Sequence, residues 1–278
     1  MLQNEFSWKT PDGLNIYAKE WKPEGEVKGS IALVHGLGEH IGRYDHVAEA
    51  FAKAGFGMVG FDLRGHGKSD GVRGYTTSNA AVMGDISQNI QNAKERFPGV
   101  PTFLYGHSLG GNLGLYFVLT QKADLKGAII TSPGLATAKP VSASLMLASK
   151  VLSVLAPKTK INNTLDVSGL SRDPSVAEKY MADPLVHPFI SPRLAVDMFA
   201  NGDYCMQHAA EFPIPLLLMQ GTEDRLVSPS KTKEFALAAP LSKITYKEWA
   251  GFYHELHNEP EKAEVLKTMV DWLNLELK

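Results

Sequence analysis

The sequence has a single cysteine, Cys205, among its 278 residues, so an internal disulfide bond is excluded. It has no cysteine and histidine cluster with the spacing of a structural zinc site, and we expect no metal. No excess of charge of either sign is present, since 28 Lys and Arg stand against 30 Asp and Glu, a formal net charge of −2. This balance gives no electrostatic reason to expect nucleic acid as a partner.

Long hydrophobic runs are also missing. The nearest candidate for a membrane-spanning segment, residues 141–156, contains Lys150 and several serines and ends at Pro157. It is shorter than the roughly 20 apolar residues that a bilayer requires. The amino terminus has neither a basic start followed by an apolar stretch nor a small-residue cleavage site, so we predict no signal peptide. Together with the lone cysteine, this favours a cytoplasmic protein.

What the sequence has is a regular alternation of short apolar runs and amphipathic segments. The runs are bounded by Gly or Pro and predict parallel strands buried on both faces, at residues 31–34, 57–61, 102–105, 128–131, 216–219 and 244–246. Helices are predicted between or after them, at residues 44–54, 79–97, 109–120, 193–210 and 259–277. Residues 5–8 and 14–21 predict an antiparallel hairpin at the sheet edge. The whole pattern predicts an α/β fold with a doubly wound, mostly parallel sheet.

One interval breaks this alternation. About 80 residues separate Ser132-Pro133, after the sixth predicted strand, from the strand that begins near Pro213, and one crossover helix needs far fewer. We therefore expect an inserted subdomain instead of a structureless loop. The predicted organisation is a first core part at residues 1–136, an insertion at residues 137–190 and a second core part at residues 191–278.

The strongest chemical signal lies between a predicted strand and a predicted helix, where residues 105–111 read YGHSLGG. Ser108 has Gly106 two residues before it and Gly110 two residues after it, which is the pattern of a nucleophile elbow. A strand that reverses into a helix so abruptly leaves no room for a Cβ atom at the flanking positions. The alternative interpretation is a glycine-rich turn with a solvated serine.

A serine nucleophile needs a base within hydrogen-bond reach and a carboxylate that orients the base. In this topology the acid and then the base are expected after later strands. Only His254 and His257 follow the last strand, and we favour His254, leaving His257 as a supporting or surface residue. Glu223 and Asp224 both follow the strand at 216–219. Asp224 is favoured because Glu223, one residue nearer the strand, should point the other way; the alternative for Asp224 is a helix cap.

Acyl transfer also requires two hydrogen-bond donors aimed at the developing oxyanion. The amide of Leu109, directly after the serine, is one candidate. The amide of Leu37, in the glycine-containing segment HGLGEH at residues 35–40, is the other; the alternative is a plain glycine turn. The segment DLRGHGKSD at residues 62–70 also contains reactive side chains, but it precedes the serine and lacks the spacing of a phosphate-binding loop, so we assign it a structural role.

Together these motifs resemble the α/β-hydrolase superfamily, and within it the monoacylglycerol lipase and lysophospholipase-like group of S33-type hydrolases. The resemblance extends from about residue 5 to the carboxyl terminus. It is carried by HGLGEH at 35–40, GRY at 42–44, GHSLGG at 106–111, SRD at 171–173, GTEDR at 221–225 and YHELHNE at 253–259. The resemblance implies an α/β-hydrolase fold with a helical cap inserted after the sixth strand.

The same resemblance implies roles for five residues of this sequence. Ser108 would be the nucleophile, Asp224 the orienting acid and His254 the base, while the amides of Leu37 and Leu109 would form the oxyanion hole. Relatives often carry a small residue and a methionine at the last two positions, so the side chains near the ester are expected to differ here. A backbone donor is unaffected by that change.

The implied activity is that of a serine carboxylic-ester hydrolase that releases fatty acid and glycerol from monoacylglycerols through an acyl-enzyme, with no cofactor. Alternatives on the same fold are a lysophospholipase, a broad-specificity carboxylesterase and an acyltransferase. A ligand-binding protein on a hydrolase scaffold is the non-enzymatic alternative. The expected partner is a lipid ester, and the sequence indicates no oligomeric state.

In this family the cap carries an apolar surface that docks on lipid. In residues 141–156, Leu145, Val151, Leu152 and Leu155 fall on one face of the predicted helix. That face fits transient contact with a membrane or micelle, packing over an acyl tunnel, or burial against the core. The sequence leaves these three interpretations open.

Overall fold

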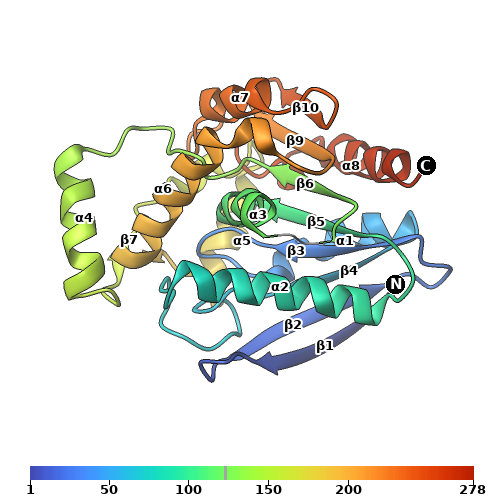
Figure 1. Cartoon of the computed structure of the whole chain (residues 1–278), viewed down its shortest axis with the longest axis horizontal. Coiled ribbons are helices and arrows are strands. Elements are labelled where there is room, and N and C mark those ends of the chain that lie inside the picture. The colour runs from blue at the N-terminus through green and yellow to red at the C-terminus, as the bar shows by residue number, and fades with distance from the viewer. Residues whose placement is uncertain (122–123) are drawn as a thin grey trace.

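The computed structural model describes residues 1–121 and 124–278. Its centre is an eight-stranded sheet in the order β1-β2-β4-β3-β5-β6-β9-β10, shown in Figure 1. Six strands run parallel to one another: β3 (Gly29–Val34), β4 (Phe56–Phe61), β5 (Thr102–His107), β6 (Gly127–Thr131), β9 (Leu216–Gly221) and β10 (Ile244–Trp249). At one edge, β1 (Leu2–Lys9) and β2 (Asn15–Lys22) form the predicted antiparallel hairpin. The predicted mostly parallel, doubly wound sheet is confirmed.

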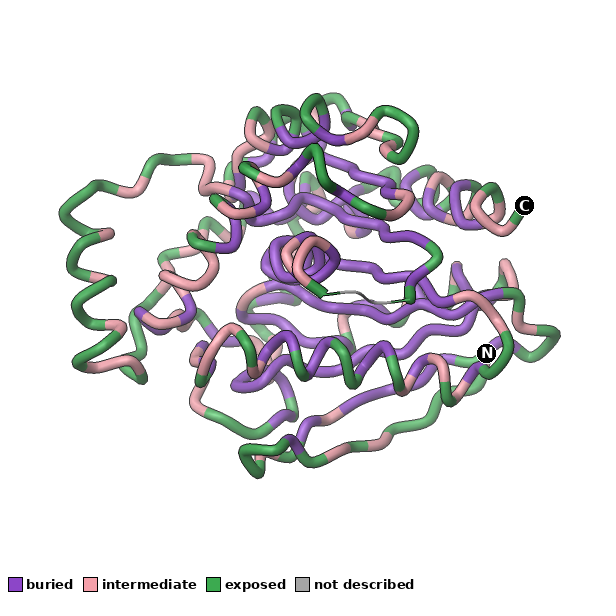
Figure 2. Tube along the Cα trace, in the orientation of Figure 1, coloured by how far each residue is buried: buried purple, intermediate pink, exposed green. Residues whose placement is uncertain are grey.

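Helices cover both faces of the sheet because alternate strand residues point to opposite sides. Ala32, Leu104 and Leu218 pack in one cluster with α2 (Asn79–Arg96), α3 (Leu109–Thr120) and α7 (Pro229–Ala238). Ile31 and Tyr105 point the other way and pack with α1 (Asp45–Lys53) and α8 (Lys262–Glu276). Figure 2 shows the buried strands running through the centre of the molecule. The apolar runs are continuous because both faces are covered.

Three helices begin with a capping residue followed by proline. Asp173 precedes α5 (Pro174–Ala182), Ser191 precedes α6 (Pro192–Gln207) and Ser228 precedes α7. In each, the side chain of the capping residue accepts a hydrogen bond from a main-chain amide of the first turn. Neither α5 nor α7 is among the helices predicted from the sequence, although this pattern indicates where each begins.

Residues 137–190 contain α4 (Ala143–Leu155), the short strands β7 (Ile161–Asn162) and β8 (Phe189–Ile190), the 3-10 helix η2 (Val167–Gly169) and α5. At the left of Figure 1, α4 stands away from the sheet and contacts α6. No residue of α4 is buried, so burial of this helix against the core, one of the three interpretations above, is wrong. Within residues 1–121 and 124–278, no helix combines the length and apolarity needed to cross a membrane.

Candidate active site

Ser108 occupies the turn between β5 and α3, at the carboxyl edge of the sheet. Its backbone is left-handed, with φ +56° and ψ −117°, a conformation that costs a non-glycine residue about 1 kcal/mol or more. The flanking glycines make the turn feasible. An ideal Cβ on Gly110 would lie 2.0 Å from the carbonyl oxygen of Val34, and one on Gly106 would lie 2.5 Å from that of Gly110. The glycines therefore have the steric role that the sequence indicates.

The structure brings Ser108, His254 and Asp224 together from the ends of different strands. Nε2 of His254 lies 2.9 Å from Oγ of Ser108, and Nδ1 of His254 lies 2.8 Å from Oδ2 of Asp224. An ionised carboxylate only accepts, so Nδ1 donates and Nε2 is left to accept from the serine. This is the arrangement in which a serine hydroxyl can lose its proton as it attacks.

Burial and neighbouring charge shift the pKa values of Asp224 and His254 in opposite directions. Burial raises the pKa of the Asp224 carboxyl, but the charge of His254 and hydrogen bonds from the amides of Leu226 and Val227 hold that pKa below its usual value. Burial lowers the pKa of His254, yet the charge and hydrogen bond of Asp224 outweigh it and raise the pKa above the ordinary value. The acid is therefore ionised at neutral pH and the base is more basic than a free histidine.

Glu223 and His257, the alternative candidates for the acid and the base, lie elsewhere. Glu223 is exposed, whereas Asp224 is buried. His257 is completely buried beneath the site, where its ring stacks on Tyr44 with 4.9 Å between ring centroids. A surface location for His257 is therefore wrong, and its contacts are those of a supporting residue.

The loop at residues 35–40 lies beside the serine, and Leu37 and Leu109 line the same cavity as Ser108. In the part of the chain that the structure describes, neither amide donates to a main-chain carbonyl in a turn or loop. The loop is fixed on both sides. Glu39 accepts from the amide of Gly36 at 2.6 Å, and Gly38, with φ +78°, accepts from the amide of His187 at 2.9 Å.

Residues 137–190 also hold the loop that carries the candidate base. The amide of His254 donates to the carbonyl of Gly169 at 3.3 Å, and the amide of Glu255 donates to that of Leu170 at 2.7 Å. Through His187, Gly169 and Leu170 the insertion contacts both the candidate oxyanion loop and the histidine loop. Its second half, residues 166–190, is therefore part of the frame of the site.

A buried ion-pair group next to the site was not found from the sequence. The guanidinium of Arg43 donates to Glu39 at 2.5 Å and, through both terminal nitrogens, to Glu255 at 2.7 Å each. It joins the oxyanion loop to the residue after the candidate base. The only sequence signal was the position of these three residues inside or beside the HGLGEH, GRY and YHELHNE segments.

The segment at residues 62–70 forms hydrogen bonds and an ion pair within the core. Asp62 accepts from the amide of Ile41 at 2.8 Å and from that of Lys68 at 2.7 Å, and Arg64 pairs with Asp85 at 2.7 Å. None of these residues lines the cavity at Ser108. Their contacts fit the structural role assigned to this segment.

A cavity of about 760 Å³ opens over Ser108 and extends between the core and residues 137–190. Its apolar lining comes from the core, from the insertion and from α6, and includes Leu37, Leu109, Val141, Leu145, Met146, Ile161, Leu165, Leu170, Ile190, Met198, Phe199, Leu226 and Val227. Its volume and lining are those of a site for a drug-sized, largely apolar ligand.

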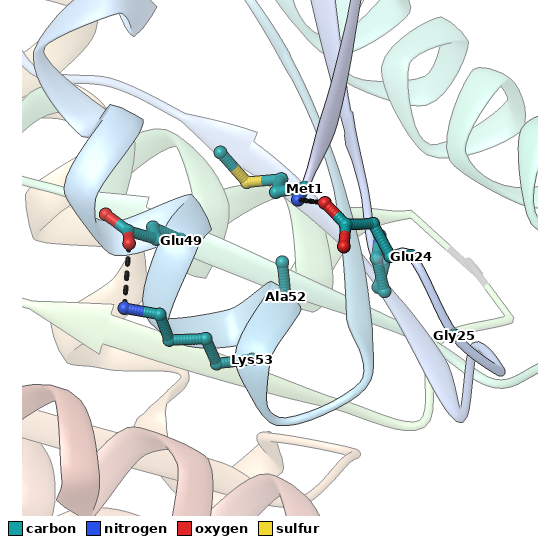
Figure 3. Close-up of a pocket in the computed structure, with 7 residues that line it drawn as sticks. Met1, Glu24, Gly25, Glu49, Ala52 and Lys53 are labelled. Carbon is teal, nitrogen blue, oxygen red and sulfur yellow. Dashed lines mark hydrogen bonds and ion pairs between the residues drawn. The ribbon is translucent and has the colours of Figure 1, made fainter.

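A second cavity, of about 440 Å³, lies away from this edge and is shown in Figure 3. It is formed by Met1, the loop after β2 and α1, and the ion pair between Lys53 and Glu49 lies at its rim. Its lining residues include no serine, cysteine or histidine. It therefore has no nucleophile and base of the kind that Ser108 and His254 provide.

Comparison with known proteins identifies the family of this chain. A family model described as serine aminopeptidase, S33, matches residues 25–261. The chain is 32% identical over 272 residues to a monoacylglycerol lipase of Mycolicibacterium smegmatis, covering 98% of this chain and 97% of the relative. It is 36% identical over 266 residues, 95% of its length, to an abhydrolase domain-containing protein of Dictyostelium discoideum, of which it spans 28%.

Among solved structures, the crystal structure of a monoacylglycerol lipase from Paleococcus ferrophilus is similar to this chain with a TM-score of 0.84 and 34% identity, covering 99% of this chain and all of that one. The likeness therefore extends over the core and the insertion alike. The chain belongs to the S33-type serine hydrolase family of the α/β-hydrolase fold.

Proposed function

We propose that this protein is a serine carboxylic-ester hydrolase that cleaves monoacylglycerols into fatty acid and glycerol. The observation that carries the proposal is the hydrogen-bonded chain from Ser108 through His254 to Asp224, which opens on an apolar cavity of about 760 Å³. The monoacylglycerol lipases among the relatives support the choice of substrate.

In the proposed mechanism, Oγ of Ser108 attacks the ester carbonyl as Nε2 of His254 takes its proton. The amides of Leu37 and Leu109 bind the oxyanion, and His254 then donates the proton to the departing alcohol oxygen. A water molecule, deprotonated by His254, attacks the acyl-enzyme and releases the fatty acid. The proton returns to Ser108, and Asp224 stabilises the imidazolium in both halves of the cycle.

The charges beside the nucleophile favour a neutral alcohol over a phosphate headgroup. Glu39 and Glu255 line the cavity, and both pair with Arg43, so two carboxylates share one guanidinium and the group carries a formal charge of −1. A phosphodiester placed near this group would meet like charge. Glycerol carries no charge, and its hydroxyls can donate hydrogen bonds to the same carboxylates.

We therefore expect monoolein to be hydrolysed with kcat/KM about tenfold or more above that of a lysophospholipid with the same acyl chain, a difference that corresponds to about 1.4 kcal/mol. The measurement is fatty-acid release from both substrates in the same detergent. Equal rates would favour a broad carboxylesterase, and a preference for the lysophospholipid would contradict the proposed substrate. A chain-length series of p-nitrophenyl esters serves as the control for activity on esters without either headgroup.

We also propose that residues 137–190 act as a cap, and that α4 brings it into transient contact with a lipid surface. Leu147, Val154 and Leu155 are 64%, 77% and 77% exposed, and Figure 2 shows α4 exposed along most of its length. The chain has no Asp or Glu from residue 125 to residue 165 but has four lysines from 137 onward: Lys139, Lys150, Lys158 and Lys160. An apolar helix flanked by unopposed cations complements an anionic membrane, and the single cysteine suits a reducing cytoplasm.

This proposal predicts binding to vesicles of mixed phosphatidylglycerol and phosphatidylcholine about tenfold tighter than to phosphatidylcholine alone, measured by co-sedimentation. Replacing Leu147 and Leu155 with serine should weaken that binding without changing turnover of a water-soluble ester, because neither residue lines the cavity. The matched control is Leu275→Ser, which alters a leucine of α8 that is 59% exposed. Binding that is indifferent to lipid charge and to both leucines would contradict the proposed contact.

A further inference from the structure

Ser132 follows β6, a central strand that supplies none of the three candidate catalytic residues. Its side chain is completely buried, and its Oγ donates to the main-chain carbonyl of His254 at 2.7 Å. Because β5, β6 and β9 are neighbours in the sheet, Ser108, Ser132 and Asp224 leave the sheet from adjacent strands. Each contacts His254: Ser108 at Nε2, Asp224 at Nδ1 and Ser132 at the carbonyl oxygen.

The backbone of Ser132 is in a conformation that glycine adopts more readily. Its φ is +45°, and in the described part of the chain the only other non-glycine residues with positive φ are Ser108 and Thr164. Ser108 keeps its strained conformation at the proposed nucleophile position. A second serine with positive φ, one strand away, indicates that its side chain also has a task.

The segment around Ser132 also fixes the nucleophile turn. The amide of Ser108 donates to the carbonyl of Thr131 at 3.1 Å, and the carbonyl of Ser108 accepts from the amide of Gly134 at 3.0 Å. The hydroxyl of Ser132 thus ties the main chain of His254 to the same segment, residues 131–134, that holds Ser108. Among main-chain donors in the described residues, only the amide of Leu256, at 3.2 Å, also reaches the His254 carbonyl.

We propose that Ser132 is a positioning residue for the catalytic base: its hydroxyl holds the main chain of His254 so that Nε2 stays in line with Ser108. Ser132 does not line the substrate cavity, so it acts through His254. The inference rests on the proposed role of His254 as the base. Small displacements of a reacting group are costly, since an error of about 1 Å lowers rates by as much as about a hundredfold.

Two variants separate this role from a purely structural one. Ser132→Ala removes the hydroxyl and keeps the backbone strain, whereas Ser132→Gly removes both, so the glycine variant should be the more stable of the two in thermal unfolding. We expect both to lower kcat by about ten- to a hundredfold with little change in KM. Labelling by a fluorophosphonate should slow in parallel, because it also depends on activation of Ser108.

The pH profile gives a second readout. Without the Ser132 hydroxyl, we expect His254 to lie farther from Asp224, so that the carboxylate raises the pKa of His254 by a smaller amount. The acid limb of the kcat/KM profile should then move to lower pH in both variants. The matched control is Ser30→Ala. Ser30 is also completely buried, and its replacement by alanine removes a side-chain hydrogen bond to Thr102 at 2.9 Å. However, Ser30 lies near the amino end of β3, whereas the site lies at the carboxyl edge of the sheet. This variant should lose stability and keep kcat.

Wild-type kcat in Ser132→Gly, or a loss of kcat in Ser30→Ala that matches Ser132→Ala at equal loss of stability, would overturn the proposal. Failure of the proposed hydrolase itself has a different signature, because Ser108→Ala would then retain turnover. Loss of turnover in Ser108→Ala together with unaltered Ser132 variants would remove only the positioning role.

Discussion

Ser108→Ala is expected to lower kcat for ester hydrolysis by about 10⁴-fold or more and to leave the fold intact. The substitution removes the hydroxyl that lies 2.9 Å from Nε2 of His254, and no covalent acyl-enzyme can then form on this residue. The side chain of Ser108 faces the cavity, so its loss leaves the packing of the sheet unchanged. Release of fatty acid from monoolein and thermal unfolding measure the two effects.

Labelling by a fluorophosphonate distinguishes the enzyme from a binding protein on the same scaffold. The wild-type chain should react at one site and the Ser108→Ala chain should not. Ser144, an exposed serine of α4, provides the control, since Ser144→Ala should label like the wild type. Turnover retained by Ser108→Ala, or a wild-type protein that does not label, would refute the assignment.

Asp224→Asn should lower kcat by about 10³- to 10⁴-fold. An asparagine amide can donate to Nδ1 of His254, which then holds its proton on Nε2 and cannot accept from Ser108. The amide oxygen can still accept from Leu226 and Val227 at the positions of Oδ1, so the loop should remain folded. Glu223→Gln is the matched control, because Glu223 is the exposed neighbour and should leave kcat unchanged.

The same variant tests the electrostatics of the base. Only neutral His254 accepts the serine proton, so activity falls as pH decreases through its pKa. Asp224 raises that pKa, so the acid limb of the wild-type profile should lie above the ordinary histidine value of about 6.5. In Asp224→Asn the residual activity should persist to lower pH. An acid limb at the same pH in both proteins would mean that Asp224 does not set the pKa of His254.

The sequence predicted the strands and the mostly parallel sheet well because buried parallel strands leave continuous apolar runs between glycines and prolines. It also predicted which residues meet at Ser108, because a nucleophile turn and the ends of later parallel strands must share one edge. His254 was preferred over His257 by position alone, and the structure places the first beside the serine and the second beneath it.

The rest depended on contacts between residues far apart in the sequence. The pairing of Arg43 with Glu255 joins residues 212 positions apart, and nothing in either local pattern indicates the partner. The role proposed for Ser132 rests on a backbone angle and on a hydrogen bond across 122 positions. The exposure of α4 was equally open, since an apolar helix face fits a core, a tunnel or a lipid surface.

Residues 166–190 form hydrogen bonds to the loops that carry Gly38 and His254, whereas residues 139–162 do not. The two parts of the insertion therefore differ in how freely their sequences can vary. Gly169, Leu170 and His187 bind the main chain of His254, Glu255 and Gly38, so we expect exchange of this half to lower turnover. Residues 139–162 contribute α4 and part of the apolar cavity wall but none of those bonds. A chimera that exchanges only this stretch with a relative's would transfer acyl-chain preference as a module and retain the native turnover machinery.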